Sequence, residues 1–284
     1  MRRRLAPYWL VLPGGLWLLV FFVVPMLAML NVSLQTGSLE TGFRQTLAWH
    51  NYTDMISSYH VQLVRSLVYG LATTVITILL AYPMAYWIAF RGGRHKSTYL
   101  FLILLPFFVT FVIRTISWQF LLADNGIVLG NLKDWGLLPG GFHVLATPYA
   151  VVGGLVYNFL PFMVLPIYVA LERIDGSLLE AAADLFAGRR EVFTKVVLPL
   201  SLPGVFAGVI LTFVPAAADY VNAQILGGTG QVMIGNIIET LYLTNSQYPQ
   251  ASALSSILLG ALLLGIFLYA KALGTRDVLD ASAG

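Results

Sequence analysis

Residues 180–199 read EAAADLFAGRREVFTKVVLP, a charge-rich segment between two of the most apolar stretches of the chain. Its run of alanines favours a helix, and Gly188 supplies a helix stop. Just upstream, Ser177 and Glu180 have the S-x-x-E spacing of a capping box, in which the serine side chain and the glutamate side chain satisfy two free N–H groups. A first short helix is therefore expected, capped by Ser177 and ended at Gly188.

A second helical piece is expected after this glycine corner. Glu191 and Lys195 are spaced i, i+4, which favours an ion pair on one helix face, and the helix should end before Pro199. The segment is then a pair of short helices at a membrane surface. The local chemistry leaves two roles open, namely docking onto another subunit and passive embedding in the interface.

The composition is that of an integral membrane protein. Of the 284 residues, 58% are hydrophobic and 10% are charged, whereas about a quarter of a soluble domain is charged. There is no cysteine, so disulfide and thiolate chemistry are excluded. The basic residues lie in short connections between apolar runs, where they set membrane topology, so nucleic-acid binding is excluded as well.

Six apolar runs are long enough to cross a bilayer core of about 30 Å. They predict an all-α membrane protein with six transmembrane helices, organised as a single domain over residues 1–284. The expected spans are approximately 8–30, 66–90, 99–122, 148–171, 202–221 and 251–273. The segment described above, taken as residues 175–199, lies between the fourth and fifth spans.

The orientation follows from the basic residues, because cytosolic loops carry an excess of Lys and Arg. Of the 16 Lys and Arg, three fall on one side of the expected spans and Arg114 falls within the third span. The other side, which includes both termini and the 175–199 segment, carries Arg2, Arg3, Arg4, Arg91, Arg94, Lys96, Arg173, Arg189, Arg190, Lys195, Lys271 and Arg276. Both termini and the segment are therefore expected in the cytosol.

The sequence offers no catalytic constellation. The four histidines fall in connections without ligand spacing, so no metal site and no catalytic residue is expected. The stretch 92–97, GGRHKS, lacks the spacing of a phosphate-binding loop, so this chain is not expected to hydrolyse nucleotide. An energy source for transport would have to be another subunit or an ion gradient.

Asp219 is the one acidic residue in an expected span. A carboxylate at membrane depth is costly unless it faces water, a cation or a partner, so it indicates a transport pathway. The structural alternatives are a side chain that reaches the outer interface or an ion pair with Arg114, which would be a clamp rather than a binding site.

Glu180, Ala181 and Ala182, followed by Val196, Leu198 and Pro199, resemble the EAA loop of permease subunits of type I ATP-binding-cassette importers, E-A-A-x3-G-x9-I-x-L-P. In that family the loop forms coupling helices that insert into a cleft of the ATPase. The pattern's glycine falls on Phe186, and a glycine follows two positions later. If Gly188 is the corner, the first helix gains about 3 Å, and Phe186 extends it and offers its ring to the ATPase.

The resemblance covers most of the chain. The segment 104–132 is similar to the IRT-x-x-W segment of permeases of the spermidine/putrescine group, here carried by Arg114 and Trp118. Asp219, Tyr220 and Val221, followed by LGG at 226–228, MIG at 233–235 and YP at 248–249, are similar to further motifs of that group in the same order.

The resemblance implies a permease subunit of a binding-protein-dependent, ATP-driven importer, not an enzyme, in the bacterial inner membrane. The partners it implies are a dimer of ATPase subunits, which would bind ATP and Mg, a second permease and an extracytosolic binding protein; no cofactor is expected in this chain. A polyamine such as spermidine or putrescine would suit Asp219 electrostatically and Tyr220 by cation–π attraction. Other small solutes, an ion-coupled secondary transporter and a membrane-embedded enzyme are the alternatives.

Two sets of site residues follow from this resemblance. The substrate pathway is expected at Asp219, Tyr220, Arg114 and Trp118. The ATPase contact is expected at Glu180, Ala181, Ala182, Asp184, Phe186 and Gly188.

Overall fold

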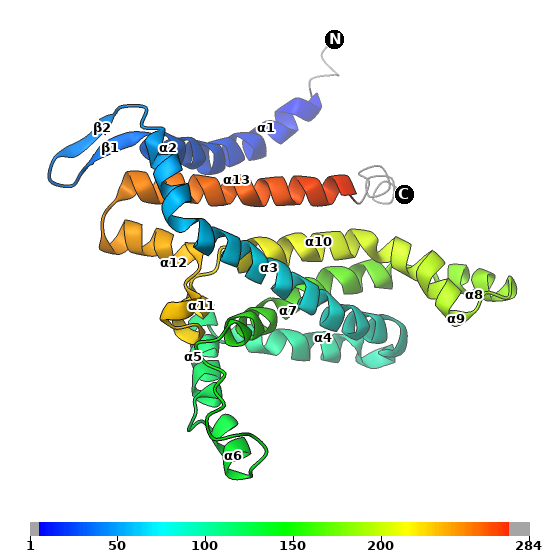
Figure 1. Ribbon diagram of the computed structural model, residues 1–284. Helices are drawn as coiled ribbons and strands as arrows, with labels where there is room; N and C mark the ends of the chain where they lie inside the picture. The colour runs from blue at the N-terminus through cyan, green and yellow to red at the C-terminus, as the bar shows by residue number, and fades with distance from the viewer. Residues whose placement is uncertain (1–5, 273–284) are drawn as a thin grey trace. The chain divides into compact units, whose positions relative to one another are not determined.

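The computed structural model describes residues 6–272, which form two compact units (Figure 1). The first unit comprises residues 6–60 and 237–261, and the second comprises 61–236 and 262–272. Helices α3 (His50–Arg91), α12 (Ile234–Glu239) and α13 (Tyr248–Ala272) contribute to both. The terminal arginines behind the expected orientation, Arg2, Arg3, Arg4 and Arg276, lie outside the described residues, so that orientation stays a prediction.

The first unit begins with α1 (Ala6–Leu18) and α2 (Val24–Ser33), joined without interruption by the π-turn η2 (Leu19–Val23). A hairpin of β1 (Gln35–Ser38) and β2 (Gly42–Gln45) follows, with Gln35 opposite Gln45. The hairpin is a departure from the all-α prediction. The side-chain amide of Asn51 secures it to α3 by donating to Ser33 O at 2.8 Å and Gln35 O at 2.9 Å. The π-turn η7 (Thr240–Thr244) leads into α13.

The second unit is built around α7 (Pro148–Glu172), the most buried of the long apolar helices. It packs along α10 (Leu198–Ala217), where Gly204 and Gly208 allow the two backbones to approach closely. A Cβ atom at Gly204 would lie 2.5 Å from Pro166 O and 2.6 Å from Ala170 Cβ. One buried cluster joins α3, α7 and the π-turn η5 (Phe193–Val197) through Ala81, Ala85, Ala89, Met163, Val164, Ile167, Leu171 and Val197.

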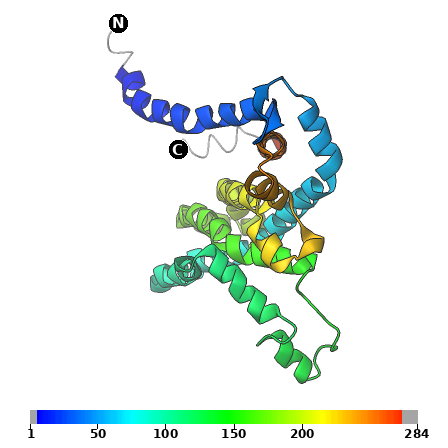
Figure 2. The same ribbon diagram turned by 90° about the vertical axis from the view of Figure 1, so that its left-hand side faces the viewer.

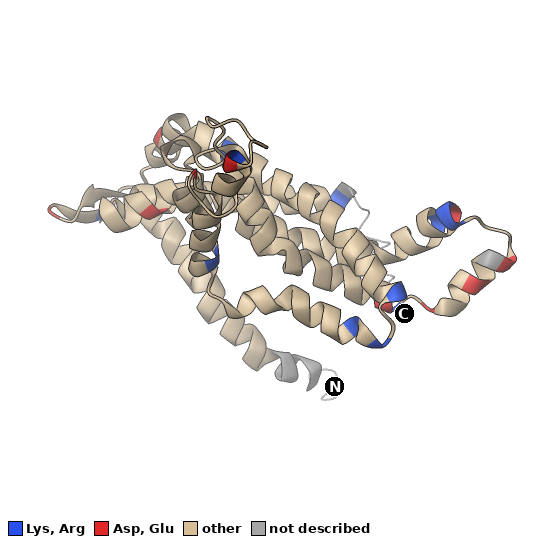
Figure 3. Ribbon diagram, turned by 90° about the horizontal axis from the view of Figure 1, so that it is seen from below, with Lys and Arg blue, Asp and Glu red and all other residues tan. Residues whose placement is uncertain are grey.

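Short elements complete the second unit. After α3 come η3 (Gly93–His95), α4 (Lys96–Leu104), η4 (Leu105–Phe108), α5 (Phe111–Leu122) and α6 (Leu129–Asp134). The loop between α7 and α10 holds α8 (Gly176–Asp184) and α9 (Arg189–Val192), and α10 is followed by α11 (Val221–Leu226) and η6 (Thr229–Gln231). Charged residues lie mostly at helix ends and in connections, with few in the helix bodies, among them Arg65 in α3 and Arg114 in α5 (Figure 3).

Within residues 6–272, five helices are long and apolar enough to cross a membrane, namely Leu12–Ser33, His50–Arg91, Pro148–Glu172, Arg189–Ala217 and Tyr248–Lys271. The third expected span, 99–122, is not one straight helix. Val109 and Thr110 are extended, and the helical segments on either side of them meet at 89° (Figures 1 and 2). Six spans are counted only if this bent pair is one span, so the six-helix count stays a prediction.

Two helix boundaries also differ from the expected ones. α3 begins at His50 rather than Ser66, and it is interrupted at Tyr59, which has φ −126° and ψ 17°. At the other boundary, α9, η5 and α10 form one uninterrupted helical run from Arg189 to Ala217. The second short helix therefore does not end before Pro199. Pro199 instead lies inside this run, two residues after the π-turn η5 ends at Val197. Its missing N–H removes one backbone hydrogen bond, a loss that membrane helices tolerate.

Candidate functional site

The loop between α7 and α10 projects beyond the ends of those helices (Figure 1). Its first helix, α8, is capped by Asp175 rather than by Ser177. Asp175 Oδ1 accepts a hydrogen bond from the Ser177 N–H at 2.9 Å, and this backbone N–H lowers the pKa of the Asp175 carboxyl. Ser177 is already inside the helix, so the predicted capping box of Ser177 and Glu180 is wrong, and Glu180 is exposed on α8.

Phe186, not Gly188, turns the chain at the end of α8. Phe186 has φ +59°, in the left-handed region that favours glycine, whereas Gly188 is extended with φ −65° and ψ 157°. The Ala187 N–H donates to Ala182 O at 3.1 Å, the 6→1 bond of a Schellman corner in which Phe186 occupies the usual glycine position. The expected extension of the first helix through Phe186 is therefore wrong, since α8 ends at Asp184.

The described residues leave the Phe186 ring at this corner almost uncovered. Phe186 is 96% exposed and the preceding Leu185 is 81% exposed, so an apolar pair stands at the tip of the loop. Glu180, Ala181, Asp184 and Gly188 are also exposed, while Ala182 is half-buried. The structure thus brings the six residues expected to contact the ATPase onto one projecting loop.

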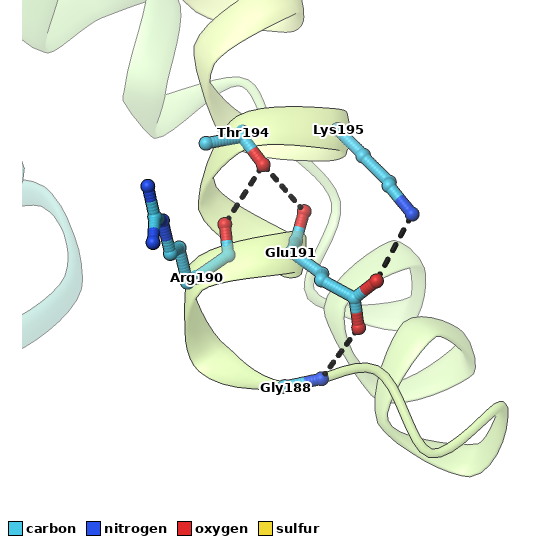
Figure 4. A network of polar contacts seen from close by, with 5 residues as sticks. All are labelled: Gly188, Arg190, Glu191, Thr194 and Lys195. Atoms are coloured by element: carbon cyan, nitrogen blue, oxygen red, sulfur yellow. Dashed lines mark hydrogen bonds and ion pairs between the residues drawn. The ribbon is translucent and has the colours of Figure 1, made fainter.

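The second half of the loop is organised by Glu191 (Figure 4). Its Oε2 accepts from the Gly188 N–H at 3.2 Å, and its Oε1 pairs with Lys195 Nζ at 3.0 Å, as the i, i+4 spacing predicts. The lysine and then the glycine N–H lower the pKa of the Glu191 carboxyl. Thr194 adds a bond from its hydroxyl to Arg190 O at 2.9 Å. Gly188 therefore starts the second helix, whereas the sequence pattern places it at the end of the first.

The expected pathway residues lie elsewhere in the second unit, around the turn from α10 to α11. Asp219 is buried there, and its Oδ1 accepts from the backbone N–H of Asn222 at 2.8 Å and from the Asn222 side chain at 3.2 Å. The carboxylate thus caps α11. Tyr220, the next residue, is 44% exposed.

Arg114 does not pair with Asp219. Among residues 6–272 the ion pairs are Lys96–Glu172, Lys133–Asp124 and Lys195–Glu191. The Arg114 guanidinium instead lies over aromatic rings, with Cζ 4.4 Å from the Phe107 centroid and 5.8 Å from that of Phe111. Trp118, one turn further along α5, packs edge-on against Tyr157 with centroids 5.3 Å apart.

A buried polar cluster joins these elements and was not singled out from the sequence. The Asn158 side-chain amide on α7 donates to Asn222 Oδ1 at 3.2 Å and to Thr115 Oγ1 at 3.3 Å. All three residues are almost fully buried. The signal that could have found them is the presence of an asparagine in the middle of an apolar span, where a polar side chain needs partners. Through Asn222, the cluster reaches Asp219.

Apolar helices of spanning length, and a helical loop that projects from the ends of two of them, are features of a permease subunit of a membrane importer. The fold has solved counterparts of this class. A bacterial ABC transporter involved in the import of the acidic polysaccharide alginate matches with TM-score 0.70 and 19% identity, covering 97% of this chain and 96% of that one. The same kind of transporter, in complex with its alginate pentasaccharide-bound periplasmic protein, matches with TM-score 0.68.

The chain belongs to the family of binding-protein-dependent transport system inner membrane components, whose sequence pattern matches residues 63–273. The spermidine/putrescine transport system permease protein PotB of Haemophilus influenzae is 36% identical over 257 residues, which is 90% of each chain. PotB of Escherichia coli is 31% identical over 268 residues, 93% of this chain and 98% of that protein. The predicted resemblance is confirmed. This chain is a permease subunit of an ABC importer, a membrane transport component rather than an enzyme.

Proposed function

We propose that this permease forms half of the translocation pathway of a polyamine importer in the bacterial inner membrane. The observation that carries the proposal is the similarity to the PotB permeases over nine-tenths of both chains. Spermidine and putrescine carry ammonium groups, so a pathway for them needs carboxylates and aromatic faces at membrane depth. Asp219 and the neighbouring exposed Tyr220 supply one of each.

The loop between α7 and α10 is the proposed contact with a dimer of ATPase subunits, which bind ATP and Mg. Its exposed apolar tip, Leu185 and Phe186, is shaped for insertion into a cleft of another protein. Glu180, Ala181, Ala182, Asp184 and Gly188 would surround that contact. A second permease would complete the pathway, and a binding protein would deliver solute from outside, as the alginate transporter with its periplasmic protein supports.

The pathway proposal gives Asp219 two separable tasks. Its Oδ1 caps α11, a task that an uncharged acceptor can perform, while its negative charge would attract the ammonium group. Arg114 and Trp118, on α5, complete the proposed lining. The carboxylate has no Arg partner among the described residues, so its charge is not already neutralised by Arg114.

The test is uptake of radiolabelled spermidine and of radiolabelled putrescine by the assembled importer, with its ATPase, second permease and binding protein, in proteoliposomes. Asp219→Asn keeps the cap and removes the charge, so assembly should persist while uptake falls. Asp219→Ala removes both, and loss of the cap should destabilise the α10–α11 turn by about 1 kcal/mol. Unchanged uptake with Asp219→Asn would remove this residue from the pathway. An importer that hydrolyses ATP in response to its binding protein but takes up neither polyamine would carry another small solute.

A further inference from the structure

Four phenylalanine rings from three elements form a linked cluster beside Arg114, which we call the aromatic cage, and two of them, Phe107 and Phe111, face the guanidinium. Phe107 of η4 meets Phe162 of α7 with centroids 5.2 Å apart, and Phe111 of α5 meets Phe159 of α7 at 6.2 Å. The two α7 rings lie 6.1 Å from each other, which closes the chain of contacts. The cage therefore spans the extended break between η4 and α5.

Phe107 and Phe111 are the cage rings that contact the charged group of Arg114. The side chain is 8% exposed, and neither Nε nor Nη1 has a hydrogen-bond partner within residues 6–272. Leaving buried donors of a charged group unpaired is costly, so this guanidinium is held mainly by cation–π attraction. That attraction requires a cation close to the ring faces and does not require the geometry of a guanidinium.

We propose that the aromatic cage is a subsite for one ammonium group of the transported polyamine, and that Arg114 occupies it as an internal competitor until substrate arrives. The proposal rests on the polyamine function proposed above. Two positive charges cannot share the same rings, so substrate can bind there only when Arg114 leaves. A side chain that leaves two buried donors unpaired gains hydrogen bonds by moving into water, which lowers the cost of the exchange.

The position of the cage favours a role in the pathway over a lipid-facing one. A charged side chain within a spanning segment normally faces a bundle interior or a water-filled cavity. Thr115, the residue after Arg114, belongs to the polar cluster that leads through Asn222 to Asp219. The cage therefore adjoins, along α5, the polar cluster that includes the one acidic residue of the expected spans.

The experiment measures spermidine affinity of the assembled importer in nanodiscs, without binding protein, by equilibrium dialysis. Arg114→Gln removes the competing cation from the cage, so affinity should rise by about 5- to 30-fold, the range between an exposed and a desolvated cation–π contact. Arg114→Lys keeps a cation for the rings and should stay near the wild-type affinity. Phe107→Leu in the Arg114→Gln background keeps an apolar side chain without the ring and should reverse the gain.

Three results overturn the cage. The first is an Arg114→Gln importer that takes up or binds spermidine no better than wild type. The second is an Arg114→Gln chain that no longer assembles with the second permease while Arg114→Lys does, which would assign Arg114 to a contact between subunits. The third is a gain in affinity that Phe107→Leu leaves intact. A wild-type importer that handles no polyamine at all would overturn the polyamine function and the cage together.

A second measurement leaves Arg114 in place. Because the chain contains no cysteine, Phe162→Cys introduces a single thiol at the rim of the cage, where the native side chain is 39% exposed, and keeps Phe107 and Phe111, the two rings that face the cation. Spermidine should protect this thiol from a maleimide by at least a few-fold, as read from the mass of this subunit. A thiol placed on the hairpin by Ser38→Cys should react at the same rate with and without spermidine. Absence of protection at position 162 would overturn the cage.

Discussion

Replacing Phe186 with glycine should stabilise the corner at the end of α8. A left-handed backbone costs an L-residue at least about 1 kcal/mol, and the Phe186 ring, 96% exposed, gains almost no packing against the described residues to offset this cost. Phe186→Gly removes that strain. A gain of about 1 kcal/mol corresponds to roughly fivefold less frequent opening of the corner.

Hydrogen exchange followed by mass spectrometry on peptides covering residues 181–190 measures this opening. The informative amides close the corner, with Leu185 N–H donating to Ala181 O at 3.2 Å and Ala187 N–H donating to Ala182 O at 3.1 Å. Both should exchange about fivefold more slowly in Phe186→Gly. Phe186→Ala keeps the Cβ atom and the strain, so exchange there should stay near the wild-type rate, which separates the backbone effect from loss of the ring.

The matched control is Gly188→Ala. Gly188 has φ −65°, and a Cβ atom there would meet nothing within 4 Å, so alanine should fit without cost. The sequence pattern implies the opposite, because a glycine that ends a helix resists replacement. Faster exchange in Gly188→Ala together with unchanged exchange in Phe186→Gly would refute the assignment of the corner to Phe186.

Two further predictions concern the second unit. Gly204→Ala should push α7 and α10 apart, because its Cβ would lie 2.6 Å from Ala170 Cβ. Thermal unfolding of the purified importer should then show a loss of stability of about 1–3 kcal/mol. Gly153→Ala is the control, since a Cβ at that position on α7 would meet nothing within 4 Å and should leave stability unchanged. An equal melting temperature for both variants would contradict the close packing. The pKa of Glu191 is lowered in the folded loop, mainly by Lys195. The Glu191 carboxylate should therefore stabilise the loop above pH 4.5, the ordinary pKa, and this stabilisation should be lost as the pH falls through the lowered pKa. Protection factors for residues 188–197, corrected for intrinsic exchange, should show this loss in the wild type and not in Glu191→Gln.

The sequence predicts the long apolar helices well, because length and hydropathy decide them. The expected span 148–171 corresponds to α7 at Pro148–Glu172, and 251–273 corresponds to α13 at Tyr248–Ala272 within the described residues. The bend in the third span was missed because it depends on two extended residues, Val109 and Thr110, that interrupt an otherwise continuous apolar run. Hydropathy does not register a change in direction.

The sequence located the loop of the candidate site, but it did not predict the backbone conformation of that loop correctly. The loop residues were found because their pattern resembles a known one, yet the corner was assigned to Gly188 on the rule that glycine prefers a left-handed backbone. In the structure the corner lies at the position where the E-A-A-x3-G pattern has its glycine. Phe186 occupies that position, although a left-handed backbone is unfavourable for residues other than glycine. Similarly, Ser177 was a sound candidate for a cap, and Asp175, two residues earlier, performs that task.

The uninterrupted helical run from Arg189 to Ala217 connects the loop between α7 and α10 directly to the turn at Asp219. Its 29 residues span about 43 Å, so a tilt of about 10° around its middle would move each end by about 4 Å, in opposite directions. Gly204 and Gly208, where α10 packs closely against α7, lie between the two ends, so the tilt would be centred on them. The π-turn at Phe193–Val197 lies near the end of the run that joins the loop, and the helix should bend there first if a force acts on the loop.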